Sequence, residues 1–569
     1  MHLRPTTKAR FRSILYLFAI GAFLLILSSR KNYSGYNLYE FEDAEVEEEE
    51  GLHPQTNTPH HHHTDTNTPT LIPAADTNTD LDFDLDSSEQ SEVLAAKPDP
   101  EKQHYGKYCP PLKCSYGRWA PRVPQFTTYE EAFQAIIFNK NDHGYGLPDP
   151  HPPSPPLEEG VEMSEEEKKE GGKQRVLEMA NWVWESDFGD MVPFDIEEFV
   201  IRLLRSPGGL FVVGDSLTTQ HFMTLRHRLL QASFFLHEDL PHWSLHDHPH
   251  VHQYGLDTNH ENTHALLSRI AERYPDLPPI PLERAKRPII THIVDQTLIN
   301  QKELNRIFRT EMGYVHGHKY TNVEGWIGFL GEMTKPREGE DGVNEDSLVV
   351  VTSGAHWSRA GLHGYSPHTL STPVIRARIE HAYAEMVKTI IPALAPLKQT
   401  TVFFRSISPG HPMCMQLTKP FRLANEEKDG RVTVEEWFSR KENQNPDVVE
   451  WDWDSFDTRN LVWKEEIAKY EEDRVSDLWI EGDGDNKKGR GAKWVYLDFW
   501  EMDLQRGDAH TLTGVGKGRW DCLHYAMPYV HNQWTDMLWH YVAVDSKLKT
   551  ELEKERGVGM MKEGRLISW

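Results

Sequence analysis

The chain has 569 residues, of which 38% are hydrophobic and 26% are charged, and its formal net charge is −27. That length admits more than one folded unit, and the hydrophobic fraction is ordinary for a globular protein. An acidic chain has no general attraction for the phosphates of nucleic acids. We therefore expect no nucleic-acid partner.

A short apolar run near the N-terminus predicts a membrane anchor. Residues 14–29 are continuously apolar as far as Leu27 and end in two serines, and four basic residues precede them. A membrane-spanning helix needs roughly 17–25 residues, so this run is at the short end. A cleaved signal peptide has the same basic and apolar parts, but no small-x-small cleavage site follows. We therefore favour a retained signal-anchor.

The distribution of basic residues predicts the topology of this anchor. The positively charged residues 1–13 would form a cytoplasmic tail, and the chain after Arg30 would be lumenal, which is a single-pass type II arrangement. A short span suits the thinner early secretory membranes, so we expect a Golgi location.

Residues 30–104 have the composition of a disordered stalk. They contain an acidic block, a run of four histidines and a loose TNTP repeat, with little apolar content. Such a segment cannot offset the ordering entropy of roughly 1–2 kcal/mol per residue. The sole glycosylation sequon starts at Asn32, close to the membrane.

The remaining residues, 105–569, are predicted to fold as one lumenal domain. All four cysteines lie here, and an even number in a lumenal protein suggests two disulfides. Three pairings are possible. We favour Cys109 with Cys114 and Cys414 with Cys522, because each pair joins segments of similar context.

Short apolar runs alternate with helical patterns in this domain, which predicts an α/β fold with a parallel sheet flanked by helices. Helices are expected from residue 196 and over 375–391, and the charged inserts 164–174, 425–445 and 471–491 are expected to be surface loops. The runs that predict buried strands are 210–213, 289–294, 348–351, 402–404 and 494–499.

A candidate nucleophile follows the first of these runs. Ser216, in the sequence Gly-Asp-Ser-Leu, comes directly after a buried-strand pattern and just before a helical one. This places it at the carboxyl end of a strand, where open α/β sheets carry their sites. A helix start there offers backbone N–H groups to a developing oxyanion. Alone, such a triplet is a weak signal.

The far end of the chain supplies a carboxylate and an imidazole three residues apart, Asp521 and His524. Residues at this spacing share one side of a helical turn. Asp521 would hold the ring of His524, which would take the proton of Ser216, as in a serine triad. A structural Asp–His hydrogen bond is the plainer alternative.

These motifs, taken in order over roughly residues 105–545, resemble the trichome-birefringence-like or PC-esterase family of the GDSL/SGNH esterase superfamily, in a fungal-type form. The resemblance rests on residues 114–119, 182–184, 194–195, 214–217, 354–357, 402–409, 504–510 and 521–524. It implies an SGNH-like domain that transfers acetyl groups to polysaccharide hydroxyls in the Golgi lumen through an acyl-serine. It also implies a membrane anchor and a linker.

The chain departs from that family at several positions. Thr218 and Thr219 stand where plant members have an arginine after the serine motif, and Tyr525 follows His524 where plant members go on to a further cysteine. The superfamily's oxyanion glycine and asparagine have no clear counterparts. Gly354, with Thr352 in the asparagine's place, is the candidate for that role.

Several further residues follow predicted strand ends. His356 and Trp357 are candidates for contact with sugar, with core packing as the alternative. The others are expected to support the triad or the fold: Arg405, His411, Asp508 and His510.

No metal or bound cofactor is expected. The alternating histidines between residues 237 and 252 lack a cysteine or a helical H-x-x-x-H pair, so a solvated loop is favoured over a zinc site. No phosphate-binding glycine loop indicates acetyl-CoA, and the acetyl donor is left open.

Three other functions stay open. An acetylesterase would use the same triad, with water in place of sugar. A type II glycosyltransferase would need a metal-binding D-x-D, for which residues 452–454 and 483–485 qualify in form. A glycan-binding protein without activity is the third, and the Ser, Asp and His set argues against it.

Overall fold

The computed structural model describes residues 107–136, 164–238, 248–309, 320–340, 342–362, 371–412, 417–420, 451–480, 491–512 and 520–563, with Leu245, Tyr365 and Cys414. The predicted tail, anchor and stalk and the sequon at Asn32 lie outside these residues, as does the insert 425–445. Within the described ranges, no helix is both long and apolar enough to cross a bilayer.

A seven-stranded sheet forms the centre of the domain, in the order β4-β5-β6-β3-β7-β8-β9. The five strands from β6 to β9 run parallel, whereas β4 and β5 join one edge antiparallel. This confirms the predicted α/β class. The strands are β3 (Leu210–Gly214), β4 (Leu236–His237), β5 (Val251–Leu256), β6 (Ile290–Val294), β7 (Ser347–Thr352), β8 (Thr400–Arg405) and β9 (Lys493–Leu497).

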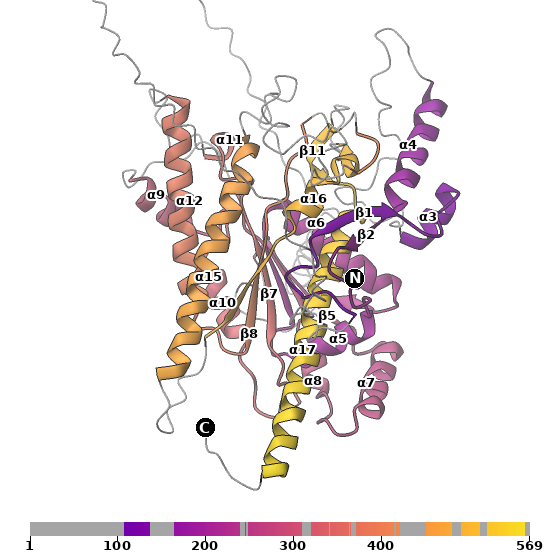
Figure 1. The fold of residues 1–569 in the computed structure, drawn as a ribbon, viewed down its shortest axis with the longest axis vertical. Coiled ribbons are helices and arrows are strands. Elements are labelled where there is room, and N and C mark those ends of the chain that lie inside the picture. The colour runs from indigo at the N-terminus through magenta and orange to yellow at the C-terminus, as the bar shows by residue number, and fades with distance from the viewer. Residues whose placement is uncertain are drawn as a thin grey trace, which may run out of the picture. The chain divides into compact units, whose positions relative to one another are not determined.

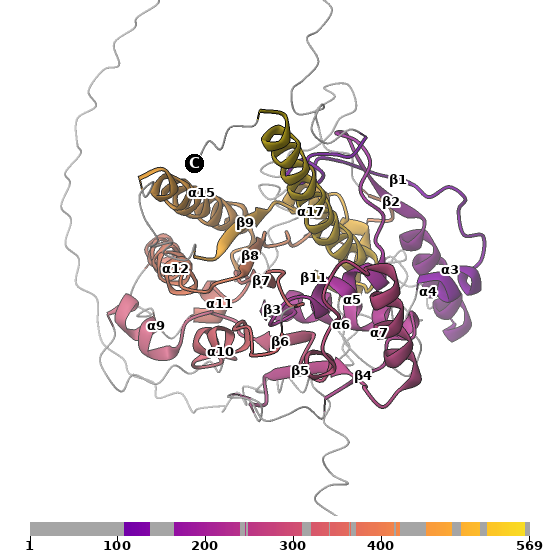
Figure 2. The ribbon, with the colours of Figure 1, turned by 90° about the horizontal axis from the view of Figure 1, so that it is seen from below.

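Alternating side chains of the strands enter two separate cores. Leu210 and Val212 of β3 pack in one core, while Phe211 and Val213 pack in the other, as the two-residue period of a strand requires. Figure 2 shows a layer of helices on each face of the sheet. A strand that is buried on both faces reads as an unbroken apolar run, which is why the sequence revealed it.

Helices α5 (Ile196–Leu204), α6 (Ser216–Gln231), α7 (Glu261–Arg273) and α17 (Tyr529–Glu563) cover one face. The other face is covered by α9 (Gln301–Phe308), α10 (Trp326–Met333), α12 (Thr372–Leu394) and α15 (Phe456–Ile480). Short helices α8 (Leu282–Ala285), α11 (Arg359–Leu362) and α16 (Trp500–Leu504) lie in the connections, with the 3₁₀ turns η4 (Trp453–Ser455) and η5 (Gly507–Ala509).

Two small hairpins stand outside the main sheet. Strand β1 (Gly117–Pro121) pairs with β2 (Trp182–Ser186), and β10 (His510–Leu512) pairs with β11 (Trp520–Tyr525). Between β1 and β2 lie α3 (Tyr129–Ile136) and α4 (Glu165–Ala180) (Figure 1).

The loop prediction for 164–174 is wrong, because this segment begins α4. The side chain of Ser164 accepts a hydrogen bond from the amide of Glu167, and the carboxylate of Glu167 accepts one from the amide of Ser164. The helix therefore starts with a capping box. Residues 471–480 likewise belong to α15 rather than to a loop.

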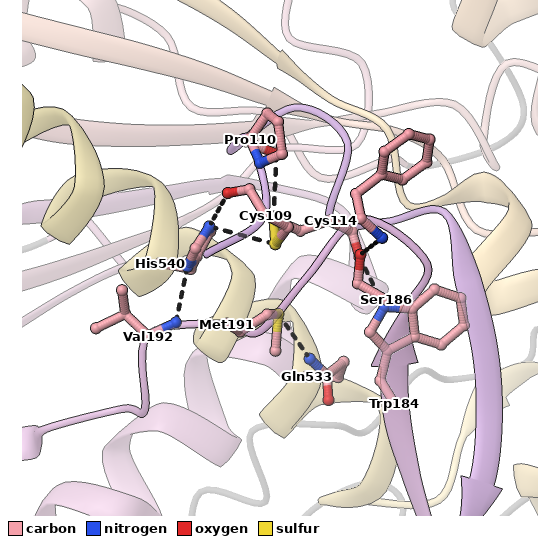
Figure 3. The surroundings of a disulfide bond; sticks show 10 residues. Cys109, Pro110, Cys114, Trp184, Ser186, Met191, Val192, Gln533 and His540 are labelled. Carbon is pink, nitrogen blue, oxygen red and sulfur yellow. Dashed lines mark hydrogen bonds between the residues drawn. A yellow bond between two sulfur atoms is a disulfide. The ribbon is translucent and has the colours of Figure 1, made fainter. Parts of the chain in front are cut away.

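A disulfide joins Cys109 to Cys114 and lies against α17 (Figure 3). His540 of α17 accepts a hydrogen bond from the amide of Val192 at Nδ1, at 2.9 Å, and its Nε2 donates to the carbonyl of Cys109 at 3.0 Å. Trp184 donates from its indole to the carbonyl of Cys114. The disulfide, one of the two pairs favoured from the sequence, closes this short segment, and the hydrogen bonds of His540 hold the segment to the last helix.

Candidate active site

Ser216 lies at the point where the central strand β3 passes into α6. Asp215 caps the helix by accepting a hydrogen bond from the amide of Leu217 at 3.2 Å, and Ser216 is the first helical residue. The helix thus includes the serine itself, whereas the sequence pattern had placed Ser216 just before it. Its amino end contributes positive potential beside the serine hydroxyl.

Gly214 is required for this tight turn. Its φ is +151°, and a Cβ atom at this position would lie 1.9 Å from the carbonyl oxygen of Thr352 on β7. The close approach of two backbones leaves no room for a side chain. The glycine of the Gly-Asp-Ser motif therefore has a steric explanation.

The structure brings Ser216, His524 and Asp521 into one line of hydrogen bonds. His524 Nε2 lies 2.6 Å from Ser216 Oγ, and His524 Nδ1 lies 2.6 Å from Asp521 Oδ2. The side chains of His524 and Asp521 are 15% and 19% exposed, so both are largely buried with a small part open to solvent. This is the geometry of a nucleophile, its general base and the carboxylate that orients the base.

Asp521 and His524 do not lie on a helical turn, as the spacing had suggested, but in a bulge of strand β11. His510 pairs with Tyr525 and Thr511 with Asp521, so the strand register skips residues 522–524. Asp521 Oδ1 accepts the amides of Leu523 and His524 at 3.1 and 3.0 Å. These bonds turn the backbone and return His524 to the side of the carboxylate.

Electrostatics favour His524 as a base. Burial acts to lower its pKa, but the charge of Asp521 and the hydrogen bond to it prevail, so the pKa of His524 is raised. Burial likewise acts to raise the pKa of Asp521, and His524 with the two amides lowers it instead. Asp521 therefore stays ionised and stabilises the imidazolium.

A second disulfide holds the bulge in place. Cys522, between the two triad residues, is bonded to Cys414, and the carbonyl of Cys522 accepts the amide of His411 at 2.8 Å. This is the second favoured pair. It attaches the triad bulge to the segment that follows β8.

The carbonyl of His524 is held by a histidine pair. His510 Nδ1 donates to that carbonyl at 2.9 Å, and His510 Nε2 lies 2.6 Å from His411 Nδ1. Burial lowers the pKa of His411 to about 4. Asp508, two residues from His510, forms an ion pair with Arg506.

Contacts from α6 hold the other side of the bulge, and no sequence pattern indicates them. Gln220 donates to the carbonyl of Tyr525 at 2.9 Å, and its own carbonyl lies 3.3 Å from Nε2 of His531. The helix that carries Ser216 thus also carries a support for the strand that carries His524. These partners are more than 300 residues apart, so no local pattern reveals them.

Arg405 is fully buried behind the nucleophile. Its guanidinium lies 3.8 Å from the ring centroid of Trp534, and that indole donates to Asp503 at 2.8 Å. Burial raises the pKa of Asp215, and the charge of Arg405 opposes this rise. Arg405, expected from the sequence to support the triad or the fold, therefore favours the ionised form of Asp215, the residue next to Ser216.

The two oxyanion candidates have other contacts. Thr352 donates its hydroxyl to the carbonyl of Arg405 at 2.9 Å. Gly354 packs against Ile407, and its carbonyl accepts from Arg459. These contacts use the hydroxyl of Thr352 and the carbonyl of Gly354. The backbone amide of Ser216, at the helix start, is a further candidate for the oxyanion.

The two sugar-contact candidates differ in exposure. Trp357 is completely buried and packs edge-on against Tyr383. This agrees with core packing, the alternative to contact with sugar. His356 is half-buried and lies edge-on to Trp451.

The histidine-rich segment is only partly a loop. His252 lies in strand β5 and stacks on His292 of β6, so the loop prediction is wrong for this residue. His242 and His246 lie outside the described residues. The one metal-capable cluster within the described ranges is Cys109, Cys114 and His540, whose sulfurs form a disulfide and whose ring nitrogens both have protein partners.

The carboxylates of one D-x-D candidate, residues 452–454, form ion pairs with arginines. Asp452 is buried and forms ion pairs with Arg359 and Arg376, and Asp454 pairs with Arg376 as well. These contacts explain both carboxylates as structural. The other candidate, 483–485, lies outside the described residues.

A scan against protein-family models and a search of curated proteins found no match for this chain. Its functional site is therefore defined by geometry. Ser216, His524 and Asp521 form a nucleophile relay, partly open to solvent, at the carboxyl end of the central strand of a parallel sheet.

Proposed function

We propose that this chain is a serine-dependent O-acetyltransferase that acts on glycan hydroxyls. The observation that carries the proposal is the relay from Ser216 through His524 to Asp521, with both contacts at 2.6 Å. The mostly parallel sheet, with the serine directly after a strand, is compatible with an SGNH-like fold.

The relay supports a double displacement. Ser216 Oγ attacks the acetyl carbonyl of a donor while His524 Nε2 takes its proton, and the leaving group then receives that proton. The sugar hydroxyl next attacks the acetyl-serine with His524 again as base, which returns the serine and yields the acetylated sugar. Asp521 stabilises the imidazolium at both stages.

The resemblance of the sequence to the trichome-birefringence-like or PC-esterase family supports acetyl transfer over simple hydrolysis. The predicted signal-anchor at residues 14–29 and the two disulfides suit a type II protein of the Golgi lumen. We propose that the acceptor is a polysaccharide or glycan. The same resemblance leaves the acetyl donor open.

The test compares the full-length protein with Ser216→Ala, each incubated with a chromogenic acetyl ester, with and without a mannan or xylan acceptor. Intact mass measurement follows the acetyl adduct on the protein, and acetyl on the polymer is measured separately. We expect an adduct on Ser216 that decays faster with acceptor present. The variant should form no adduct.

Other outcomes point to the alternatives. Release of free acetate at the same rate with every acceptor would indicate an acetylesterase with the same triad. Equal activity in both proteins would remove Ser216 from the chemistry. Manganese-dependent use of a nucleotide sugar would indicate the glycosyltransferase instead.

A further inference from the structure

A groove of about 330 Å³ lies between the first hairpin and α4, and nothing in the triad chemistry accounts for it. Its aromatic side chains are Phe126 and Trp182, both half-buried. Its polar lining consists of three side-chain amides, one carboxylate and one hydroxyl, from Gln125, Gln174, Asn181, Glu178 and Thr418.

The groove is held open by its own hydrogen bonds. Asn181, which ends α4, accepts the amide of Phe126 at 2.8 Å and donates to its carbonyl at 3.0 Å. Arg122 stacks its guanidinium 4.9 Å from the ring centroid of Phe126 and donates to the carbonyl of Ala180. A wall fixed in this way loses little entropy when a ligand binds.

Both walls of the groove are linked to the hairpin of β10 and β11, and β11 carries Asp521 and His524. On the α4 side, Arg175, next to Gln174, donates to the carbonyl of Asp508, just before β10. On the other side, Thr418 is four residues from Cys414, which is bonded to Cys522 in the triad bulge. Four residues span at most about 14 Å. In Figure 1, α4 and β11 lie at the same end of the domain.

The lining selects the chemistry of a ligand. Aromatic faces suit the apolar faces of sugar rings, and amides with a carboxylate suit their hydroxyls. None of the described residues that line the groove is basic, and Glu178 contributes negative charge. Arg122, the cation that stacks on Phe126, donates to the carbonyl of Ala180. An anionic polysaccharide would therefore face the carboxylate of Glu178, whereas a neutral one would meet no repulsion.

We infer that this groove is a subsite for a neutral stretch of the acceptor polysaccharide, beside the triad and separate from it. The inference rests on the proposed function for its acceptor class. The subsite holds the polymer while a hydroxyl further along the chain reaches the acetyl-serine. It touches no reacting atom, so a small acetyl ester does not need it.

The first test measures binding without chemistry. Full-length Ser216→Ala protein in detergent is bound to mannan as a neutral probe and to polygalacturonate as an anionic one. We expect mannan binding to weaken about tenfold, or about 1.4 kcal/mol, on adding Trp182→Ala. The double change of Gln125 and Gln174 to Ala should act in the same direction, and both of these side chains are exposed, so folding is not at risk.

The matched control is Phe188→Ala, which removes an exposed aromatic side chain that does not line the groove. It should leave mannan binding unchanged. With Ser216 restored, the groove variants should raise KM for the polymer while hydrolysis of a small acetyl ester stays the same. That division separates a subsite from a general loss of structure.

The inference is overturned by any of three results. These are unchanged mannan binding in both groove variants, equal binding of polygalacturonate, or no mannan binding by the Ser216→Ala parent. If mannan binding depends on Trp182 but ester hydrolysis does not depend on Ser216, the subsite is supported and the proposed serine chemistry is contradicted.

Discussion

Asp521 has two tasks at the scale of single residues, since one oxygen holds the ring of His524 and the other holds the backbone of the bulge. Asp521→Asn keeps the shape but removes the charge that raises the pKa of His524. We expect kcat to fall by about 10⁴-fold, the loss known for such a change in serine triads.

The same substitution predicts a shift in pH dependence. His524 must be neutral to act as base, and its pKa in the native protein lies above 6.5, so activity should fall as the pH drops through that raised value. In Asp521→Asn the acid limb should move to lower pH. A pH profile of kcat/KM for an acetyl ester checks this, with Asp498→Asn, from a surface ion pair with Lys464, as control. An unmoved acid limb would contradict the assignment of the base.

Arg405 and Asp215 are expected to depend on each other for stability. Arg405→Met removes the charge that compensates for the burial of the carboxylates of Asp503 and Asp215, which should lower the free energy of unfolding by about 1–3 kcal/mol. Adding Asp215→Asn removes one of these two carboxylates, so part of the loss should return. Urea unfolding of both single variants and the double variant measures the coupling. Strictly additive losses would show that the two side chains act independently.

At the scale of elements, the junction of β3 and α6 depends on Gly214. In Gly214→Ala, the new Cβ meets the Thr352 carbonyl, and the positive φ adds strain, so we expect a loss of about 3 kcal/mol or more. Gly325→Ala is the matched control. It has a φ of +83° with no atom near the new Cβ, and should cost only about 1–2 kcal/mol. Equal losses in thermal or urea unfolding would mean that the contact with β7 is not the cause.

The elements also show what the sequence can and cannot reveal. The parallel strands were predictable because burial on both faces produces runs such as 348–351, and Ser216 was predictable because it follows one of them. The start of helix α4 was predicted as a loop because the segment is highly charged, although Ser164 and Glu167 have the spacing of a capping box. The contacts of Gln220 and His510 could not be predicted from the sequence. Each joins a side chain to a backbone carbonyl whose position only the folded domain defines.

At the scale of the whole molecule, the two disulfides should differ in their effect on stability. Cys414 and Cys522 are 108 residues apart, whereas Cys109 and Cys114 are separated by 5. Loop-closure entropy gives about 4.7 kcal/mol for a loop of about 100 residues and about 2 kcal/mol for one of about five. Replacing Cys414 and Cys522 by Ser should therefore lower the unfolding free energy more than replacing the other pair.

The same pair of variants should differ in activity. Loss of the Cys414–Cys522 bond frees the bulge that carries His524, so esterase activity should fall even at temperatures where the fold persists. The Cys109–Cys114 pair lies against α17 and should affect stability alone (Figure 3). Activity loss of equal size in both would contradict a specific role for the long-range bond.

The 308 residues between Ser216 and His524 also set an order in time. At about 5–20 residues per second, the ribosome adds the histidine roughly 15–60 s after the serine. During that interval Ser216 is an ordinary alcohol, and the nascent chain has no means of attacking an acyl group. Activity begins only when the last part of the domain returns to the middle of the sheet, so a truncated translation product carries the nucleophile without its reactivity.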